Sequence, residues 1–104
     1  MDLSCGSGLM TRRLAASKKY SRVIGGDLSA AMLSETRRRF VKNGLGKPEL
    51  IRCDVSRLPV KSGSVDGIHA GAALHCWTRL EEALSEIHRV LKPGGVFFAT
   101  TFLM

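Results

Sequence analysis

The feature that most constrains the fold is the alternation of short apolar runs with longer segments of helical periodicity. Residues 1–4 read as the end of a strand, a helical segment follows at 9–17, and a buried strand is expected at 23–27. The pattern continues with a helix at 29–43, strands at 49–54 and 67–72, a helix at 80–91 and a fifth strand at 96–101. This order predicts one α/β domain with a largely parallel sheet and right-handed crossover connections.

Local signals define two of the expected helices. Ser29 is a favourable N-cap, and Gly44 can end the same helix in the left-handed conformation. The buried face of this helix is expected to comprise Leu33, Phe40 and Val41. The last helix carries an apolar stripe of Leu80, Ala83, Leu84, Ile87, Val90 and Leu91. The Lys-Pro-Gly-Gly sequence at 92–95 is expected to stop that helix.

The chain of 104 residues carries a formal charge of +7, and much of the excess lies in two segments, 12–22 and 37–42. A basic excess can serve RNA or an anionic membrane surface. We interpret these side chains instead as the solvated outer faces of two helices, because an amphipathic surface helix keeps its charged face in water. This interpretation disfavours nucleic acid as a partner.

The three cysteines, Cys5, Cys53 and Cys76, form no Cys-x-x-Cys pair. An odd number at these spacings argues against a disulfide framework and against zinc, so we expect reduced thiols and no metal. No apolar run reaches the roughly 18 residues that a transmembrane helix needs, so no transmembrane segment is expected. The first residues also lack the pattern of a signal peptide, and any targeting segment is expected to lie outside this chain.

Glycine and polar residues follow the expected strands where these strands end. Gly6 and Gly8 come after the first strand, Asp27 ends the second, Asp54 ends the third, and His75 follows the fourth. Parallel strands end at one edge of a sheet, and ligands of α/β sheets bind at that edge. We therefore expect these residues to border a shared binding crevice.

Each of these positions has a chemical interpretation. Glycines let the backbone pass close to a ligand, and Asp27 lies nineteen residues after Gly8, where dinucleotide-type folds bind ribose hydroxyls. Asp54 can accept a hydrogen bond from an adenine amino group, with Val55 beside the ring. The nicotinamide fingerprint is incomplete, because Thr11 stands where its third glycine belongs. The simpler alternatives are a tight turn at the glycines and turn-capping by each aspartate.

Four segments in order carry a family resemblance: "DLSCGSG", "VIGGDLS", "CDVSRLPVKSGSVDGIHAGAALHCW" and "EIHRVLKPGGVFFATTF". They resemble the successive motifs of class I S-adenosylmethionine-dependent methyltransferases. The most similar branch is the methyltransferase type 11 domain, related to ubiquinone/menaquinone-biosynthesis enzymes. The stretch "AGAALHCW" is similar to plant, plastid-associated members. The resemblance implies a Rossmann-like three-layer sandwich, with about five of the family's seven strands present.

The resemblance also implies roles for particular residues toward the cofactor, S-adenosyl-L-methionine. The residues that match cofactor-binding positions are Asp2, Gly6, Gly8, Asp27, Leu28, Asp54 and Val55. The first three would line the methionine and ribose part, Asp27 would bind the ribose hydroxyls, and Leu28 would pack on the adenine. Asp54 and Val55 would meet the adenine edge, and residues 70–75 would lie beside the sulfonium and the incoming substrate.

The sequence departs from the family in two respects. Ser4 stands where the family commonly has glycine, two residues after the first acid, and a serine is tolerated there if its φ is negative. Family members also have further structure before the first strand and two more strands after the fifth. Residues 1–104 are therefore expected to be one S-adenosylmethionine-binding domain that is incomplete at both ends.

The remaining chemistry-bearing residues are assigned more simply. His75 is the best-placed candidate for a catalytic base or a substrate contact, with a structural role as the alternative. His69 is expected within the fourth strand and His88 on an exposed helix face. Trp77 either walls the substrate pocket or covers the sheet edge, and Asp66 is expected in a turn or cap.

Together these expectations predict a methyltransferase that acts on a small-molecule methyl acceptor by direct displacement at the sulfonium methyl. Two alternatives stay open: a methyltransferase acting on RNA, which the charge favours, and a non-catalytic remnant that holds no cofactor. The resemblance suggests a plastid, and the sequence leaves the compartment and the acceptor undetermined.

Overall fold

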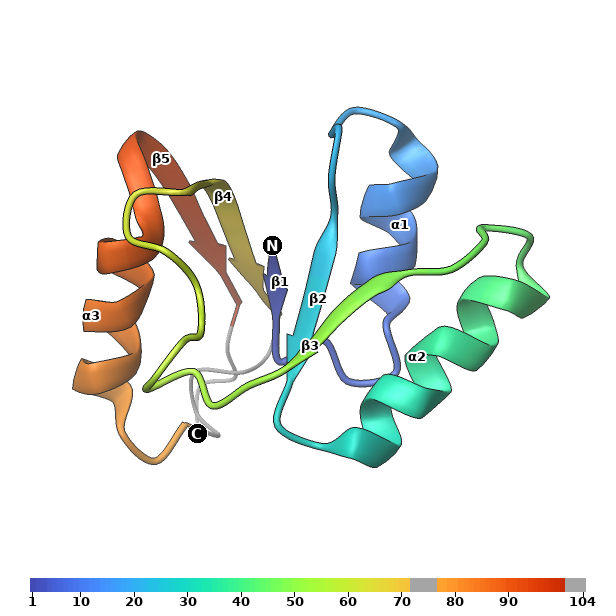
Figure 1. Cartoon of the computed structure of the whole chain (residues 1–104), viewed down its shortest axis with the longest axis horizontal. Coiled ribbons are helices and arrows are strands. Elements are labelled where there is room, and N and C mark those ends of the chain that lie inside the picture. Colours follow the sequence, from blue (N-terminus) through green and yellow to red (C-terminus); the bar gives the residue numbers. More distant parts are fainter. Residues whose placement is uncertain (72–76, 101–104) are drawn as a thin grey trace.

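The computed structural model describes residues 1–71 and 77–100, which form a five-stranded sheet with helices on both faces (Figure 1). The elements in chain order are β1 (Asp2–Leu3), α1 (Leu9–Ser17), β2 (Ile24–Asp27), α2 (Ala30–Lys42), β3 (Glu49–Arg52), β4 (Val65–Ala70), α3 (Leu80–Val90) and β5 (Leu91–Ala99). The strand order is β3-β2-β1-β4-β5, and every neighbouring pair is parallel. The predicted α/β architecture is confirmed.

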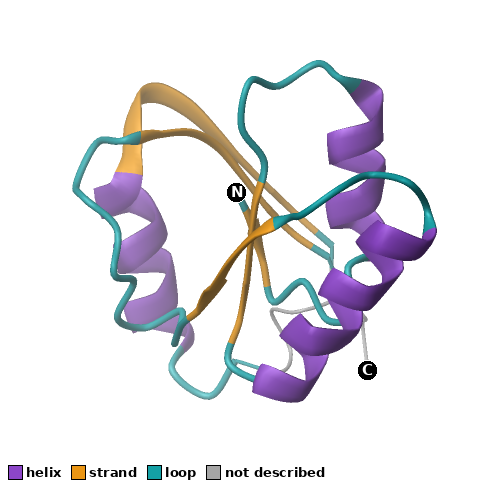
Figure 2. Cartoon of the chain, turned by 45° about the vertical axis from the view of Figure 1, so that its right-hand side comes forward, coloured by secondary structure: helices purple, strands orange, loops and turns teal. Residues whose placement is uncertain are grey.

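The helices form two outer layers around the sheet. Figures 1 and 2 both show α1 and α2 on one side and α3 on the other. The strand order reverses at β1, whose neighbours are β2 and β4. In an open parallel sheet this switch point is where a crevice forms beyond the strand ends.

β1 is the central strand although it has only two residues. Asp2 and Leu3 pair with Gly25 and Gly26 of β2, and Asp2 also pairs with His69 of β4. Asp2 is 2% exposed and Leu3 is 1% exposed. The short strand therefore delivers the following glycine loop, residues 5–8, to the middle of the sheet's carboxyl edge.

The main core lies between the sheet and α3. It comprises Leu3, Leu58, Ile68, Ala70, Ile87 and Val90. On α3 the fully buried line is Ala83, Ile87 and Val90. Leu80 and Leu84 are 41% and 40% exposed, so the predicted stripe is too wide. These two leucines lie at the margin of the buried line, where the helix surface turns toward solvent.

α2 has the predicted ends but a different buried face. The Met32 N–H donates to Ser29 Oγ at 3.2 Å, and Gly44 follows the helix with φ 70. The buried residues are Leu33, Thr36 and Phe40. The prediction for Val41 is wrong, because this side chain is 65% exposed. Thr36 can occupy the buried face because its hydroxyl donates to the Gly6 carbonyl at 2.8 Å.

The third and fourth strands differ from their predicted bounds. β3 ends at Arg52 rather than at 54, because the chain turns there and the Arg57 N–H donates to the Asp54 carbonyl at 3.0 Å. β4 begins at Val65, so Asp66 lies inside a strand rather than in a turn. Its carboxylate pairs with Lys92 Nζ of β5 at 3.1 Å.

The fifth strand begins earlier than predicted. α3 ends at Val90, and β5 follows at Leu91 without an intervening loop. The pairing of β4 with β5 shifts register between Val65, which pairs with Leu91, and Gly67, which pairs with Val96. This shift accommodates residues 92–95, which include Gly94 at φ 81. The Lys-Pro-Gly-Gly sequence thus stops the helix as expected while forming an irregular start to the strand. Position 101, the predicted end, lies outside the described residues.

Candidate functional site

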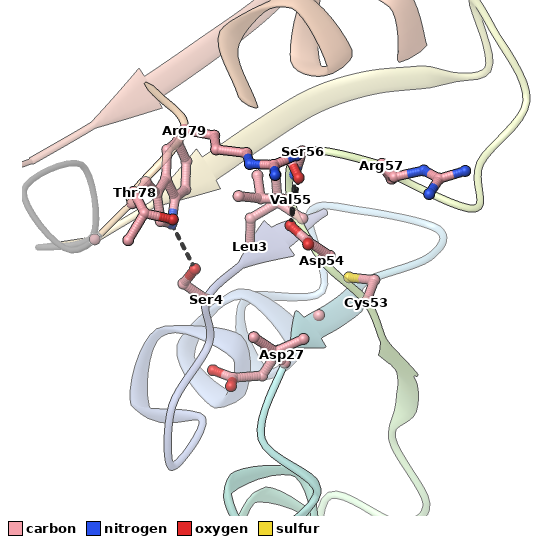
Figure 3. A pocket seen from close by; sticks show the side chains of 14 residues that line it. Leu3, Ser4, Asp27, Cys53, Asp54, Val55, Ser56, Arg57, Thr78 and Arg79 are labelled. Carbon is pink, nitrogen blue, oxygen red and sulfur yellow. Dashed lines mark hydrogen bonds between the residues drawn. The ribbon is translucent and has the colours of Figure 1, made fainter. Parts of the chain in front are cut away.

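A cleft of about 650 Å³ lies at the carboxyl edge of the sheet (Figure 3). The ends of β1, β2 and β3 contribute Leu3, Ser4, Asp27, Leu28, Asp54 and Val55 to its lining. The wall also includes Gly71, after β4, the segment 77–79, before α3, and Gly26, Cys53, Ser56 and Arg57. Four parallel strands therefore end around a single cleft, and its volume falls within the roughly 300–1,000 Å³ usual for ligand sites.

Asp27 connects the end of β2 to the glycine loop. Its Oδ2 accepts a hydrogen bond from the Gly6 N–H at 2.9 Å, and its Oδ1 accepts one from the Ser29 N–H at 2.8 Å. The side chain therefore caps the turn into α2, as the simpler alternative predicted, and it also lines the cleft. A carboxylate has about four acceptor positions, so these two bonds leave capacity for hydroxyl donors of a ligand.

Asp54 occupies the corresponding place after β3. Its Oδ1 accepts hydrogen bonds from the N–H and the hydroxyl of Ser56, at 2.9 and 2.7 Å. These bonds hold the pKa of Asp54 below its usual value, with smaller contributions from Arg79 and Arg57. Within residues 1–71 and 77–100, Oδ2 has no hydrogen-bond partner. The cleft therefore contains a charged carboxylate with one acceptor oxygen that no described residue uses.

Two side chains of α3, Glu86 and Arg89, bind the backbone of the loop that follows Asp54. The Arg89 guanidinium donates to the carbonyls of Leu58 and Val60, each at 2.9 Å. Glu86 pairs with Arg89 at 2.6 Å, and its Oε1 accepts the Leu58 N–H at 2.8 Å. These contacts fix the backbone on that side of the cleft against α3.

The glycine loop is held from the opposite side by α2. The Thr36 hydroxyl donates to the Gly6 carbonyl, so the Gly6 residue is bonded through both its N–H and its C=O. Gly6 has φ 57 and Gly8 has φ 85. A Cβ on Gly8 would lie 2.5 Å from Thr36 Cγ2, whereas one on Gly6 would meet nothing within 4 Å. Gly8 is thus required for the close packing of the loop on α2.

Ser4 lacks the negative φ under which a serine is tolerated at this position. Its φ is 55, in the left-handed region that glycine adopts without strain. The turn out of β1 places Ser4 in this conformation. The Ser4 hydroxyl accepts a hydrogen bond from Trp77 Nε1 at 3.0 Å, drawn as the dashed line that ends on Ser4 in Figure 3.

Asp2 is buried and does not line the cleft. Its Oδ2 accepts a hydrogen bond from the Thr11 hydroxyl at 2.6 Å, and its Oδ1 lies 2.9 Å from His69 Nδ1. The His69 ring stacks on Phe98 with centroids 5.8 Å apart. His69 lies within β4 as predicted, and the buried carboxylate joins α1 to β1 and β4.

The structure brings together some of the predicted site residues and not others. Asp27, Leu28, Asp54 and Val55 line the same cleft, while Asp2, Gly6 and Gly8 are absent from its lining. His75 and Cys76, with most of the segment 70–75, lie outside the described residues. Trp77 lines the cleft and also packs against the main core. His88 is exposed on α3, as predicted.

Sequence reasoning missed two residues that shape the site, Thr36 and Ser56. Thr36 lies three positions after Leu33 and four before Phe40, so helical spacing alone could have placed it on the buried face. Ser56 lies two residues after Asp54, which is the spacing of an aspartate that caps a turn.

Two thiols are half-buried near the site. Burial raises the pKa of Cys5 to about 11, and it raises that of Cys53 to about 11 as well. Both are free cysteines, and Cys53 lines the cleft. They are therefore neutral thiols near neutral pH.

The described part of the chain has neither a cluster of potential metal ligands nor a membrane-spanning helix. No group of three or more His, Cys, Asp or Glu residues there is arranged to hold a metal ion. None of the described helices has the length and apolar character needed to cross a bilayer.

Comparison with known proteins identifies relatives along nearly the whole chain. Residues 1–99 match the methyltransferase domain family. The chain is 53% identical to an uncharacterised chloroplastic methyltransferase of Arabidopsis thaliana, over 99% of this chain and 30% of that protein. It is 33% identical to a ubiquinone/menaquinone biosynthesis C-methyltransferase of Desulfotalea psychrophila, over 91% of this chain and 37% of that protein. The chain thus spans about a third of the length of these relatives.

Solved structures have the same fold. The cyclase SpnF matches with a TM-score of 0.88 and 27% identity, over 96% of this chain and 37% of that one. An S-adenosylmethionine-dependent methyltransferase from Clostridium acetobutylicum matches with a TM-score of 0.80 and 33% identity, over 93% of this chain and 40% of that one. The chain therefore belongs to the methyltransferase domain family and has the Rossmann-like fold of S-adenosylmethionine-dependent methyltransferases.

Proposed function

We propose that this chain binds the adenosyl group of S-adenosyl-L-methionine in the cleft and serves methyl transfer to a small molecule. The observation that carries the proposal is that Asp27 and Asp54, at the ends of neighbouring strands, line one cleft. Asp27 retains acceptor capacity for the ribose hydroxyls, and Asp54 Oδ2, which has no partner among the described residues, can accept from the adenine amino group. The exposed apolar side chain of Leu28 and that of Val55 lie beside these carboxylates and suit the faces of a purine.

The chain's own contribution to methyl transfer is alignment. When bound, S-adenosylmethionine supplies an electrophilic methyl group on a positively charged sulfur. Asp27 and Asp54 hold the adenosyl end, and the loop bonded to Thr36 fixes the backbone beside it, so that orientation supplies most of the rate gain. A general base is needed only where the acceptor must lose a proton. His75 stays the predicted candidate for that step.

Calorimetric titration of this chain with S-adenosylmethionine and S-adenosylhomocysteine tests the proposal. We expect both to bind at one site, because both carry the adenosyl group that the aspartates are proposed to recognise. ATP is the matched control, since it shares the adenosine but places three phosphates where the methionine portion would lie. Absence of binding by the first two ligands, in a folded chain, supports the alternative of a non-catalytic remnant.

RNA is a second candidate acceptor, which one feature of the structure favours. Arg13 of α1 and Arg37, Arg38 and Lys42 of α2 are exposed, and these two helices lie on the same side of the sheet (Figure 2). Binding of a structured RNA that weakens steeply with salt would favour this acceptor. We favour a small molecule because these cations lie on the helices rather than in the cleft lining.

A plastid location is proposed on the similarity to the chloroplastic relative from Arabidopsis thaliana. Expression of the full-length protein in leaf cells, fused at its C-terminus to a fluorescent reporter, tests it. Fluorescence that coincides with chlorophyll is the expected result, and a diffuse signal outside plastids contradicts it.

A further inference from the structure

Ser4 immediately precedes the glycine loop, in a conformation that disfavours a side chain. Its φ of 55 brings its Cβ close to the following carbonyl oxygen, a strain that glycine avoids. Ser4 and Lys18 are the two non-glycine residues of positive φ in the described structure, and Ser4 alone of this pair lines the cleft. A serine at this strained position of the site calls for an interaction that glycine cannot make.

That interaction is a hydrogen bond between Ser4 and Trp77, both of which line the cleft. The indole Nε1–H donates to Ser4 Oγ at 3.0 Å, although the two residues are 73 positions apart in the chain. Trp77 is the single tryptophan of the sequence, and its ring both packs on the core and lines the cleft. The hydrogen bond thus ties the end of β1 to the segment that precedes α3, the dashed connection in Figure 3.

We propose that this hydrogen bond is a latch that fixes the indole of Trp77 as one wall of the cleft, with Ser4 as its positioning residue. Without the Ser4 hydroxyl the indole N–H loses its protein acceptor, and the ring is free to turn toward water. Ligand binding must then include the entropic cost of ordering that wall. The part of the inference that concerns the cofactor rests on the function proposed above.

The test compares Ser4→Gly with Ser4→Ala, because the two variants separate the hydroxyl from the backbone strain. Both remove the hydroxyl, whereas Ser4→Gly alone relieves the strain. We expect both to bind S-adenosylhomocysteine about two- to tenfold more weakly, the range of one neutral hydrogen bond. Ser4→Gly should nevertheless melt at a higher temperature than Ser4→Ala. The latch is overturned if affinity instead follows stability, so that Ser4→Gly binds S-adenosylhomocysteine as tightly as the wild type does.

A double-mutant cycle that combines Ser4→Gly with Trp77→Phe tests whether Ser4 acts through Trp77. Phenylalanine retains an aromatic ring but has no N–H donor, so Ser4→Gly should weaken binding no further in that background. If the two substitutions instead weaken binding by factors that simply multiply, Ser4 acts without Trp77.

Tryptophan fluorescence separates failure of the latch from failure of the proposed function. If the wild-type chain binds no S-adenosylhomocysteine, the function fails, and the latch is still measurable in the ligand-free protein. Ser4→Gly should then shift the Trp77 emission to longer wavelength and increase its quenching by acrylamide. Emission and quenching equal to those of the wild type overturn the latch whether or not the chain binds the ligand.

Discussion

Gly8→Ala is the substitution whose cost the structure defines most closely. The new Cβ would lie 2.5 Å from Thr36 Cγ2 and 2.8 Å from Thr36 Oγ1, and the residue has φ 85. The left-handed backbone costs a non-glycine residue about 1–2 kcal/mol. Overpacking against the buried Thr36 adds about 1–3 kcal/mol, because α2 must shift to make room. The expected loss of unfolding free energy is therefore about 2–5 kcal/mol.

Gly6→Ala is the matched control for Gly8→Ala. Gly6 has φ 57, but a Cβ there would meet nothing within 4 Å, so only the backbone cost of about 1–2 kcal/mol applies. Urea unfolding of both variants measures the difference, which should be about 1–3 kcal/mol. Each kcal/mol corresponds to a melting temperature lower by about 4–8 °C in a chain of this size.

The role of Thr36 is tested by adding Thr36→Ala to Gly8→Ala. Truncation of Thr36 removes the two atoms nearest the new Cβ, so the double variant should lose less stability than the two single variants together. Equal stabilities of Gly6→Ala and Gly8→Ala, or additive losses in the double variant, would refute the reasoning from the contact with Thr36.

Three further predictions concern charge and chemistry. Asp27→Ala should weaken S-adenosylhomocysteine binding by roughly 1.5–3 kcal/mol, the value of a charge-assisted hydrogen bond, and an unchanged calorimetric affinity rejects the ribose role. Hydrogen bonds from two arginines lower the pKa of Glu35 from 4.5 to about 2, so its stabilisation is present above pH 4.5 and is lost as the pH falls toward 2. Glu35→Gln should flatten that part of the stability profile, and identical acid unfolding curves contradict this. Cys5 and Cys53, with pKa values of about 11, should react slowly with iodoacetamide at about pH 8, and rapid labelling detected by mass spectrometry counts against their burial.

The sequence signals succeeded where local chemistry determines the backbone. α1 was predicted with its observed bounds, and Ser29 caps α2 because its hydroxyl satisfies an N–H that the first turn leaves unpaired. The prediction failed where polarity was used in place of helical position. Val41 is apolar but lies on the exposed side of α2, whereas Thr36 is buried because its hydroxyl finds a carbonyl partner.

Local sequence patterns could not predict contacts between residues that lie far apart in the chain. Nothing in the sequence indicates that Asp2 would meet His69, because their pairing depends on β1 and β4 becoming neighbours. The same applies to the hydrogen bond between Ser4 and Trp77. By contrast, Asp27 could be placed at the crevice because it closes a strand and the ends of parallel strands share one edge of the sheet.

The central claim is that Asp27, which ends β2, and Asp54, which follows β3, hold one adenosyl group. The most direct measurement is a crystal structure of the chain with S-adenosylhomocysteine bound. The account predicts both ribose hydroxyls within hydrogen-bond distance of Asp27 and the adenine amino group beside Asp54 Oδ2. A ligand that lies elsewhere, or an adenine that contacts neither aspartate, contradicts it.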